Sequence, residues 1–321
     1  MYMYYNYPKL ILKTGGTHMQ TYLYFPAFVS PKQLTEKLLA MTPRFQAPPK
    51  VYGTFHTCSL VIVLIICILM IAWHLKASKS PPGKILNKES TLKISLLGFF
   101  LVLFLSELGK QLIFSYDAAA ETWRYCFEKF PFQLCSTPIY ISLAAYLLPC
   151  RGIPGRIRDA LVCFLGTYSA IAGASVLFYP SPDVFSEIIY LNIHTMLWHG
   201  IMLIYGLYLW LAGFVKPRIS TAFKGFAVFL PLNFIALALN EAEHLTGFAG
   251  GEYFNMFYIS RYYTCNIPVL HEIQKTMPYP VFFAAFIMTL SIASFAVVLI
   301  MMLISKKARG FRNRRKTDKS R

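Results

Sequence analysis

Residues Thr57–Leu75 read TCSLVIVLIICILMIAWHL, a stretch without one Asp, Glu, Lys or Arg. A helix rises 1.5 Å per residue, so this stretch would extend for about 28 Å, close to the ~30 Å hydrocarbon thickness of a bilayer. Inside a bilayer every backbone amide must find its partner within the protein, and a helix satisfies this need within one segment. The stretch is therefore predicted to be a membrane-spanning helix.

Six further apolar stretches of similar length follow along the chain. They are Lys93–Tyr116, Pro131–Pro149, Ile157–Tyr179, Ile188–Val215, Gly225–Leu245 and Val281–Ser305. Hydrophobic residues make up 56% of the 321 residues and charged residues only 14%, whereas soluble proteins carry about 25% charged residues. The sequence thus predicts an all-α fold, a polytopic membrane protein built as a seven-transmembrane-helix bundle.

The basic residues predict the orientation of this bundle. Lys and Arg gather in alternate loops, at Lys76, Lys79, Lys84, Lys88, Arg151, Arg156, Arg158, Lys216, Arg218 and Lys224, and again in the C-terminal segment RGFRNRRKTDKSR. Because cytoplasmic loops of membrane proteins carry an excess of Lys and Arg, we expect the N-terminus outside and the C-terminus in the cytoplasm. A multi-pass protein of the cell membrane is the predicted localisation.

Three parts of the chain differ in composition. Residues 1–50 are rich in tyrosine and form a predicted extracellular or interfacial extension, residues 51–305 form the membrane domain, and residues 306–321 form a basic cytoplasmic tail. The net charge of +17 is concentrated in the loops and the tail, where anionic lipid is the expected partner. No recognition module accompanies the charge, so nucleic acid is not an expected partner.

Polar residues within the predicted spans gather at one depth. They lie toward the predicted outer ends of four helices, at Glu107, Lys110, Gln111, Gln133, Cys135, Asn192, His194, His199, Asn240, Glu241 and His244. Polar groups at membrane depth are costly and by default indicate a functional site. The sequence therefore predicts a polar site in the outer half of the bundle, although Glu107 and Lys110, at i and i+3, are also placed to form an internal ion pair.

The absence of known catalytic motifs excludes several classes of enzyme but does not identify the reaction. The chain has no GxSxG, phosphate-binding loop, HExxH or dinucleotide motif, and no cysteine pair has CxxC spacing. One alternative is a metal-dependent lipid hydrolase, with zinc held by His194, His199 and His244 together with Glu107 or Glu241. A second is a non-catalytic transporter, receptor or assembly factor. Cys126 and Cys265 fall in predicted outer loops, where they are able to form a disulfide.

Four segments carry a family resemblance. They are YGTFHTCSL before the first span, FPFQLCSTP at the third, LWHG in the fifth, and NMFYISRYY with MPYPVFF before the seventh. With these segments the chain resembles the YwaF family of integral membrane proteins and the related animal transmembrane protein 164 acyltransferases. The family pattern has histidine where this chain has Gln133.

The resemblance implies a lipid acyltransferase or hydrolase that acts on membrane phospholipids without a cofactor or metal. In the animal relatives a cysteine receives the acyl chain and a histidine assists, and the matching positions here are Cys135 and His199. A cysteine thiolate is a strong nucleophile once a neighbouring base takes its proton. We therefore expect Cys135 and His199 to lie within hydrogen-bond reach, with Asn192 or Asn240 orienting the histidine or donating to an oxyanion.

Overall fold

The computed structural model describes residues 33, 43–77, 88–117, 122–181, 184–265, 267 and 269–319. Most of the predicted N-terminal extension lies outside the described residues. Helices run through nearly all of the rest, and the only paired strands in the described ranges are the two-residue strands β1 (Tyr116–Asp117) and β2 (Thr122–Trp123). The predicted all-helical fold is confirmed.

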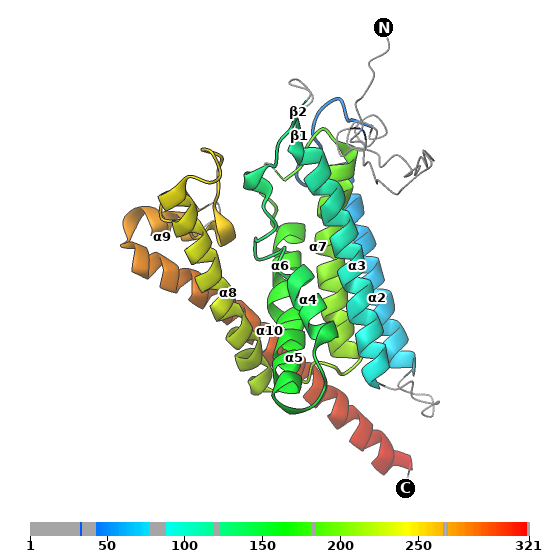
Figure 1. Ribbon diagram of the computed structural model, residues 1–321. Coiled ribbons are helices and arrows are strands. Elements are labelled where there is room, and N and C mark those ends of the chain that lie inside the picture. Colours follow the sequence, from blue (N-terminus) through cyan, green and yellow to red (C-terminus); the bar gives the residue numbers. More distant parts are fainter. Residues whose placement is uncertain are drawn as a thin grey trace, which may run out of the picture.

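Helices of nine residues or more cross the molecule in alternate directions, except that Gly152–Phe164 and Ala170–Phe178 run the same way (Figure 1). In chain order they are α2 (Thr54–Ala77), α3 (Lys88–Ser115), α4 (Pro138–Leu147), α5 (Gly152–Phe164), α6 (Ala170–Phe178), α7 (Ile189–Leu211), α8 (Ile219–Thr246) and α10 (Tyr279–Lys319). A five-residue π-helical segment, η2 (Leu165–Ser169), joins α5 to α6 into one continuous rod. The short elements η1 (Phe127–Lys129), η3 (Met256–Tyr258) and α9 (Leu270–Thr276) lie at the end of the molecule that also holds β1 and β2.

Helix α7 lies at the centre of one half of the bundle and packs against α2, α3 and α6. Small residues bring α6 and α7 close together. A Cβ atom added to Gly173 would lie 2.6 Å from the carbonyl oxygen of His199, and one added to Gly206 would lie 2.5 Å from the Cβ of Ala170. Small residues at such contacts let the backbones of membrane helices approach. Helices α8 and α10 pack on each other and lean away from α2 and α3 (Figure 1).

Five helical rods in the described residues are long and apolar enough to cross a bilayer. They are Thr54–Lys76, Lys88–Ser115, Gly152–Phe178, Ile219–Thr246 and Tyr279–Lys306. Four of these rods expose most of their apolar length on the outside of the bundle, whereas Gly152–Phe178 is mostly buried inside it. Exposed apolar faces are the arrangement that lipid requires and water opposes. The chain is a multi-pass membrane protein.

The third and fifth predicted spans differ from the expectation. Helix α4 has only 10 residues, because residues 131–137 form turns, Pro138 occupies the start of the helix and the residue before Pro149 is extended. Helix α7 is long enough, but its Asn, His, Trp and Tyr residues lower its hydropathy below that of the five rods. At the other end of the chain, α10 continues as a helix past Ser305 to Lys319, through most of the predicted tail.

One buried histidine fastens α2 to α6. The backbone N–H of Tyr52 donates to Nδ1 of His56 at 3.0 Å. Since Nδ1 accepts, Nε2 of His56 carries the proton and donates it to the carbonyl oxygen of Leu177 at 2.9 Å. The ring is completely buried, so both of its nitrogens are satisfied without water.

Candidate functional site

A buried polar cluster joins the C-terminal half of α3 to the N-terminal half of α7. Glu107 on α3 binds the Lys110 ammonium at 2.7 Å and accepts a hydrogen bond from the Gln111 amide at 2.7 Å. From α7, Nε2 of His194 lies 3.9 Å from Glu107, and its Nδ1 lies 2.7 Å from the hydroxyl of Ser106. The Glu107–Lys110 ion pair that the spacing allowed is confirmed, and His194 belongs to the same cluster.

His199 lies one helical turn further along α7 and is differently bonded. Its ring is 8% exposed. Nδ1 lies 2.7 Å from the backbone carbonyl of Thr195, and a carbonyl oxygen can only accept, so Nδ1 carries the proton. Nε2 then has a free lone pair, and no group in the described residues forms a hydrogen bond with this buried nitrogen. An unpartnered buried acceptor is unusual, because leaving one unsatisfied costs about 1–3 kcal/mol.

Cys135 lies in the turns just before α4 and is partly buried. The indole N–H of Trp198, the residue next to His199, donates to its carbonyl oxygen at 2.8 Å, which fastens the cysteine backbone to α7. The expected hydrogen bond between Cys135 and His199 is not formed, since Nε2 has no partner.

Two amide side chains tie the Cys135 segment and α8 to the turn η3. The Gln133 amide donates to the carbonyl of Asn255 at 2.8 Å, and its oxygen accepts from the N–H of Phe257 at 2.8 Å. The Asn240 oxygen accepts from the N–H of Met256 at 2.7 Å, and its NH₂ donates back to the carbonyl of the same residue at 3.1 Å. Gln133 therefore holds the backbone of η3.

Neither asparagine of the sequence hypothesis reaches a histidine. The oxygen of Asn192 accepts from the Ser186 N–H at 2.8 Å and its NH₂ donates to the Ser186 carbonyl at 2.7 Å, so it closes the loop before α7. Asn240 is occupied by η3. The prediction that one of them orients His199 is wrong, because each is fully engaged with backbone.

Glu241 and His244 lie apart from the cluster. Glu241 accepts from the Tyr262 hydroxyl at 2.8 Å and pairs with Arg261 at 2.9 Å, and the ring of His244 stacks on Tyr262 with centroids 3.5 Å apart. Within the described residues no three His, Cys, Asp or Glu side chains are grouped to hold a metal ion. The zinc site drawn from His194, His199 and His244 is therefore not assembled.

The two cysteines of the predicted outer loops are not bonded to each other. Cys126 and Cys265 are both free thiols, so the disulfide that their positions allowed is absent. Burial raises the pKa of both thiols, which leaves them mostly in the unreactive thiol form near neutral pH.

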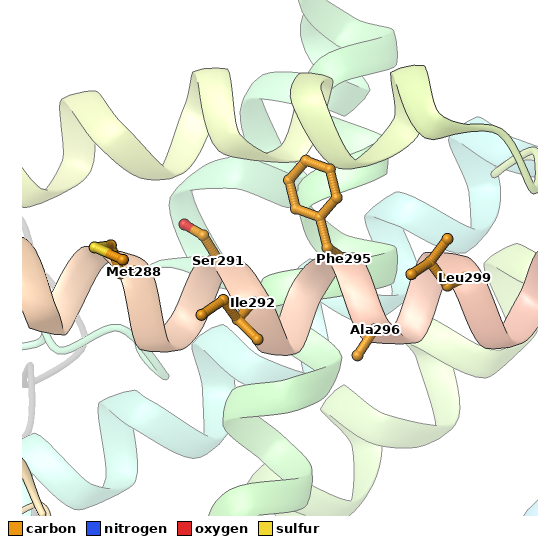
Figure 2. Close-up of a pocket in the computed structure, with 6 residues that line it drawn as sticks. All are labelled: Met288, Ser291, Ile292, Phe295, Ala296 and Leu299. Carbon is orange, nitrogen blue, oxygen red and sulfur yellow. The ribbon is translucent and has the colours of Figure 1, made fainter.

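Surface depressions lie away from this polar site. One runs along α10 and is lined by Met288, Ser291, Ile292, Phe295, Ala296 and Leu299 (Figure 2). Another lies among α2, α3 and α7, and its lining includes Met70, Phe99, Ile201 and Tyr208. Neither lining holds an acid, a base, a histidine or a cysteine. These depressions present hydrocarbon and a few hydroxyl groups, so they suit packing against lipid and not chemistry.

Three features of the site were not anticipated from the sequence. They are the bond from Trp198 to Cys135, the carbonyl of Thr195 that fixes the His199 tautomer, and the position of Tyr258. Tyr258 belongs to the turn η3 and directly follows Phe257, whose N–H donates to the Gln133 oxygen at 2.8 Å. The segment NMFYISRYY, already singled out for its family resemblance, was the available signal.

Comparison with known proteins gives one match. The family model described as the TMEM164 family matches residues 51–309. This match confirms the expected relation to the transmembrane protein 164 proteins, and it does not carry the YwaF name. No curated protein and no solved structure matches the chain.

Proposed function

Because the chain belongs to the TMEM164 family, we propose that it is a lipid acyltransferase or hydrolase in which Cys135 is the nucleophile and His199 the base. Its substrates are membrane phospholipids. No metal or cofactor takes part in the proposed reaction.

The observation that supports this proposal best is the state of His199. The Thr195 carbonyl fixes the ring with the proton on Nδ1, so the lone pair on Nε2 is left free in a buried place. That is the arrangement of a general base, whose second nitrogen is held by a carbonyl or carboxylate. A base waiting for a proton is left without a partner, whereas a purely structural histidine, such as His56, has both nitrogens satisfied.

A second observation that supports the proposal is the attachment of Cys135 to α7. Trp198 connects its backbone to the turn of α7 that carries His199. Burial works against a free thiolate at Cys135, so removal of the thiol proton needs a base such as His199. The proposed reaction requires the Cys135 thiol to reach Nε2 of His199, a hydrogen bond of the kind that empty sites commonly hold loosely.

In the proposed reaction His199 Nε2 takes the thiol proton and the Cys135 sulfur attacks the ester carbonyl carbon of a phospholipid. The sulfur–carbon bond forms, the ester carbon–oxygen bond breaks, and the proton on Nε2 passes to the departing glycerol oxygen. A hydroxyl of a second lipid, or water, then attacks the thioester with the same base, which returns the free thiol.

The membrane arrangement that we propose has seven crossings, with α4 and α7 completing the five apolar rods. The N-terminus is outside and the C-terminus in the cytoplasm of the cell membrane, where the basic tail meets anionic lipid. Supporting this, the predicted basic loops join helix ends on the same side of Figure 1 as the C-terminus. Cys135 then lies toward the outer surface, at the depth of lipid ester groups.

The test is to incubate purified protein with phosphatidylcholine that carries an alkyne-tagged acyl chain. We expect label on the Cys135 peptide that hydroxylamine releases. Cys135→Ala should abolish it and His199→Ala should lower it at least tenfold, whereas the matched controls Cys150→Ala and His244→Ala, both at exposed positions, should keep it. Absent label in the wild type, or label indifferent to Cys135, would favour a non-catalytic protein.

A further inference from the structure

A buried arginine on α5 has a free hydrogen-bonding edge. Arg158 is only 5% exposed, and its Nη1 donates at 3.3 Å to Oε1 of Glu89, which lies at the start of α3. Its Nε and Nη2 are both buried, and no group in the described residues forms a hydrogen bond with either of them. Arginine is almost never buried unless it is paired, and it cannot lose its charge. Two open donors on one buried guanidinium therefore call for an explanation.

The two free nitrogens lie on the same edge of the guanidinium. The N–H of Nε and the neighbouring N–H of Nη2 point in the same direction, and together they form the fork that binds two oxygens of a carboxylate or a phosphate. Glu89 occupies a different corner of the group, at Nη1. The edge of Arg158 that is suited to a second oxyanion is therefore open.

The described part of the chain supplies no second anion to this edge. Glu89 also has Lys93 as a neighbour, four residues further along α3, so one carboxylate is shared by two cations. Asp159, next to Arg158 in the chain, binds the Lys224 ammonium on α8 instead. Within the described residues the fork of Arg158 thus lacks a partner, and an anion from outside the chain would balance its charge.

The position of Arg158 along its rod brings the guanidinium near the lipid headgroups. The rod Gly152–Phe178 has 27 residues, about 40 Å, so when centred in the bilayer it extends about 5 Å beyond the ~30 Å hydrocarbon layer at each end. Arg158 follows the start of the rod by about 9 Å, which places its Cα about 4 Å below that boundary. A helical side chain leans toward the N-terminus of its helix, which here is the nearer membrane surface, and long basic side chains extend to the headgroups.

Arg158 also lies where α5 enters the bundle. It is the first buried residue of α5, since Ile153 and Ile157 before it are 72% and 48% exposed, whereas residues 161–170 are all buried. Lipid can therefore contact the helix up to the residue that precedes the arginine. The two free nitrogens are themselves covered by protein atoms, so binding requires a shift of the side chains at this boundary.

We propose that the Nε–Nη2 edge of Arg158 binds the phosphate group of a phospholipid in the leaflet that surrounds the start of α5. Two phosphate oxygens accept one hydrogen bond each from the fork, while Glu89 keeps its hydrogen bond from Nη1. The bound lipid then joins the start of α3 to the start of α5. This site does not rest on the proposed acyl transfer, because it binds a phospholipid without reacting with it.

The experiment measures the Tm of the purified full-length chain in detergent during titration with three probes. They are phosphatidylglycerol, a diacylglycerol with the same acyl chains but no phosphate, and inorganic phosphate. Arg158→Lys keeps the positive charge and loses the fork. The matched control, Arg156→Lys, makes the same change at an exposed position of the same helix, so the attraction of the other basic residues for anionic lipid is equal in the two variants.

We expect phosphatidylglycerol to raise the Tm of the wild type saturably, because a ligand that binds only the folded protein stabilises it, and diacylglycerol to leave the Tm unchanged. Arg158→Lys should raise the midpoint concentration of the phosphatidylglycerol titration by about tenfold or more, since a bidentate pair of charge-assisted hydrogen bonds is lost. Arg156→Lys should leave the midpoint within about twofold of the wild type.

An equal midpoint in the two variants, or an equal rise in Tm with diacylglycerol, would overturn the proposal. A rise with inorganic phosphate and none with phosphatidylglycerol would assign the edge to a soluble anion and overturn it as well. If Arg158→Lys does not fold, Glu89→Gln decides the matter. This variant removes the neighbouring negative charge and should lower the midpoint by about threefold or more, and an unchanged or higher midpoint would contradict binding at the fork.

Discussion

Gln133→Leu tests whether the site depends on the side-chain amide that holds the turn η3. The substitution keeps the approximate size of the side chain and removes both hydrogen bonds to η3, each 2.8 Å long. The carbonyl of Asn255 and the N–H of Phe257 would then lack partners, and both residues are 1% exposed, so water cannot replace the amide. At about 1–3 kcal/mol for each orphaned group, the turn should lose about 3 kcal/mol.

That loss has a direct kinetic signature. A change of about 3 kcal/mol raises the population of the open turn by roughly a hundredfold, and amide exchange at Phe257 should accelerate by the same factor. The assay is hydrogen–deuterium exchange with mass spectrometry of peptides that cover residues 250–260, in detergent or nanodiscs. Gln46→Leu, the same change at an exposed position, is the control. Acceleration below threefold, or equal acceleration in both variants, would refute the reasoning.

Three further predictions follow from single contacts. Trp198→Phe removes the indole N–H that donates to the Cys135 carbonyl, a hydrogen bond worth about 1 kcal/mol, and should slow the acylation of Cys135 by about fivefold. The control Trp210→Phe loses an equivalent hydrogen bond to the Gly166 carbonyl and should leave the acylation rate unchanged. Equal acylation rates in the two variants would contradict this prediction. Gly173→Ala forces a Cβ within 2.6 Å of the His199 carbonyl oxygen, so it should lower the free energy of unfolding by about 1–3 kcal/mol and lower the Tm measured in detergent. The control Gly98→Ala, with nothing within 4 Å of the added Cβ, should raise the Tm slightly. A higher Tm for Gly173→Ala than for Gly98→Ala would be incompatible with the α6–α7 contact. Burial raises the pKa of the Cys265 thiol, so the rate of its labelling by maleimide should increase about tenfold per pH unit from pH 7 to 9. The free energy of unfolding should fall as the pH rises past the ordinary thiol pKa of about 8.5, because the unfolded chain then loses the proton that the folded protein keeps. A labelling rate that does not change with pH would show an exposed thiolate and contradict the prediction.

The helices were predictable because their signal is local. An apolar run that can satisfy its own backbone in lipid has one stable solution, so Thr57–Leu75 and four other runs became the expected rods. The third run is α-helical over only ten residues because its first residues are held in turns by contacts from elsewhere. One of these, from Gln133 to Phe257, joins residues 124 positions apart, which no local pattern contains.

Depth in the membrane predicted only part of the site. It correctly brought Glu107 and His194 together, because α3 and α7 pack side by side. It failed for Glu241 and His244, which lie at the end of a helix that leans away from α3 and contact Tyr262 and Arg261 instead. Residues at the same depth in the membrane can point toward different neighbouring helices. The tilt of each helix depends on its packing against the others, which cannot be derived from a single sequence.

The buried ring of His56 also imposes an order on biosynthesis. Its acceptor, the Leu177 carbonyl, is 121 residues further along the chain, and a ribosome adding 5–20 residues per second needs on the order of ten seconds to make that stretch. Helix α2 is apolar enough to remain in the bilayer during this interval, but its imidazole must stay at the hydrated surface until α6 arrives. Helix α2 is therefore inserted into the membrane before it is attached to α6. The hydrogen bond from His56 to Leu177 can form only after more than half of the chain has been synthesised.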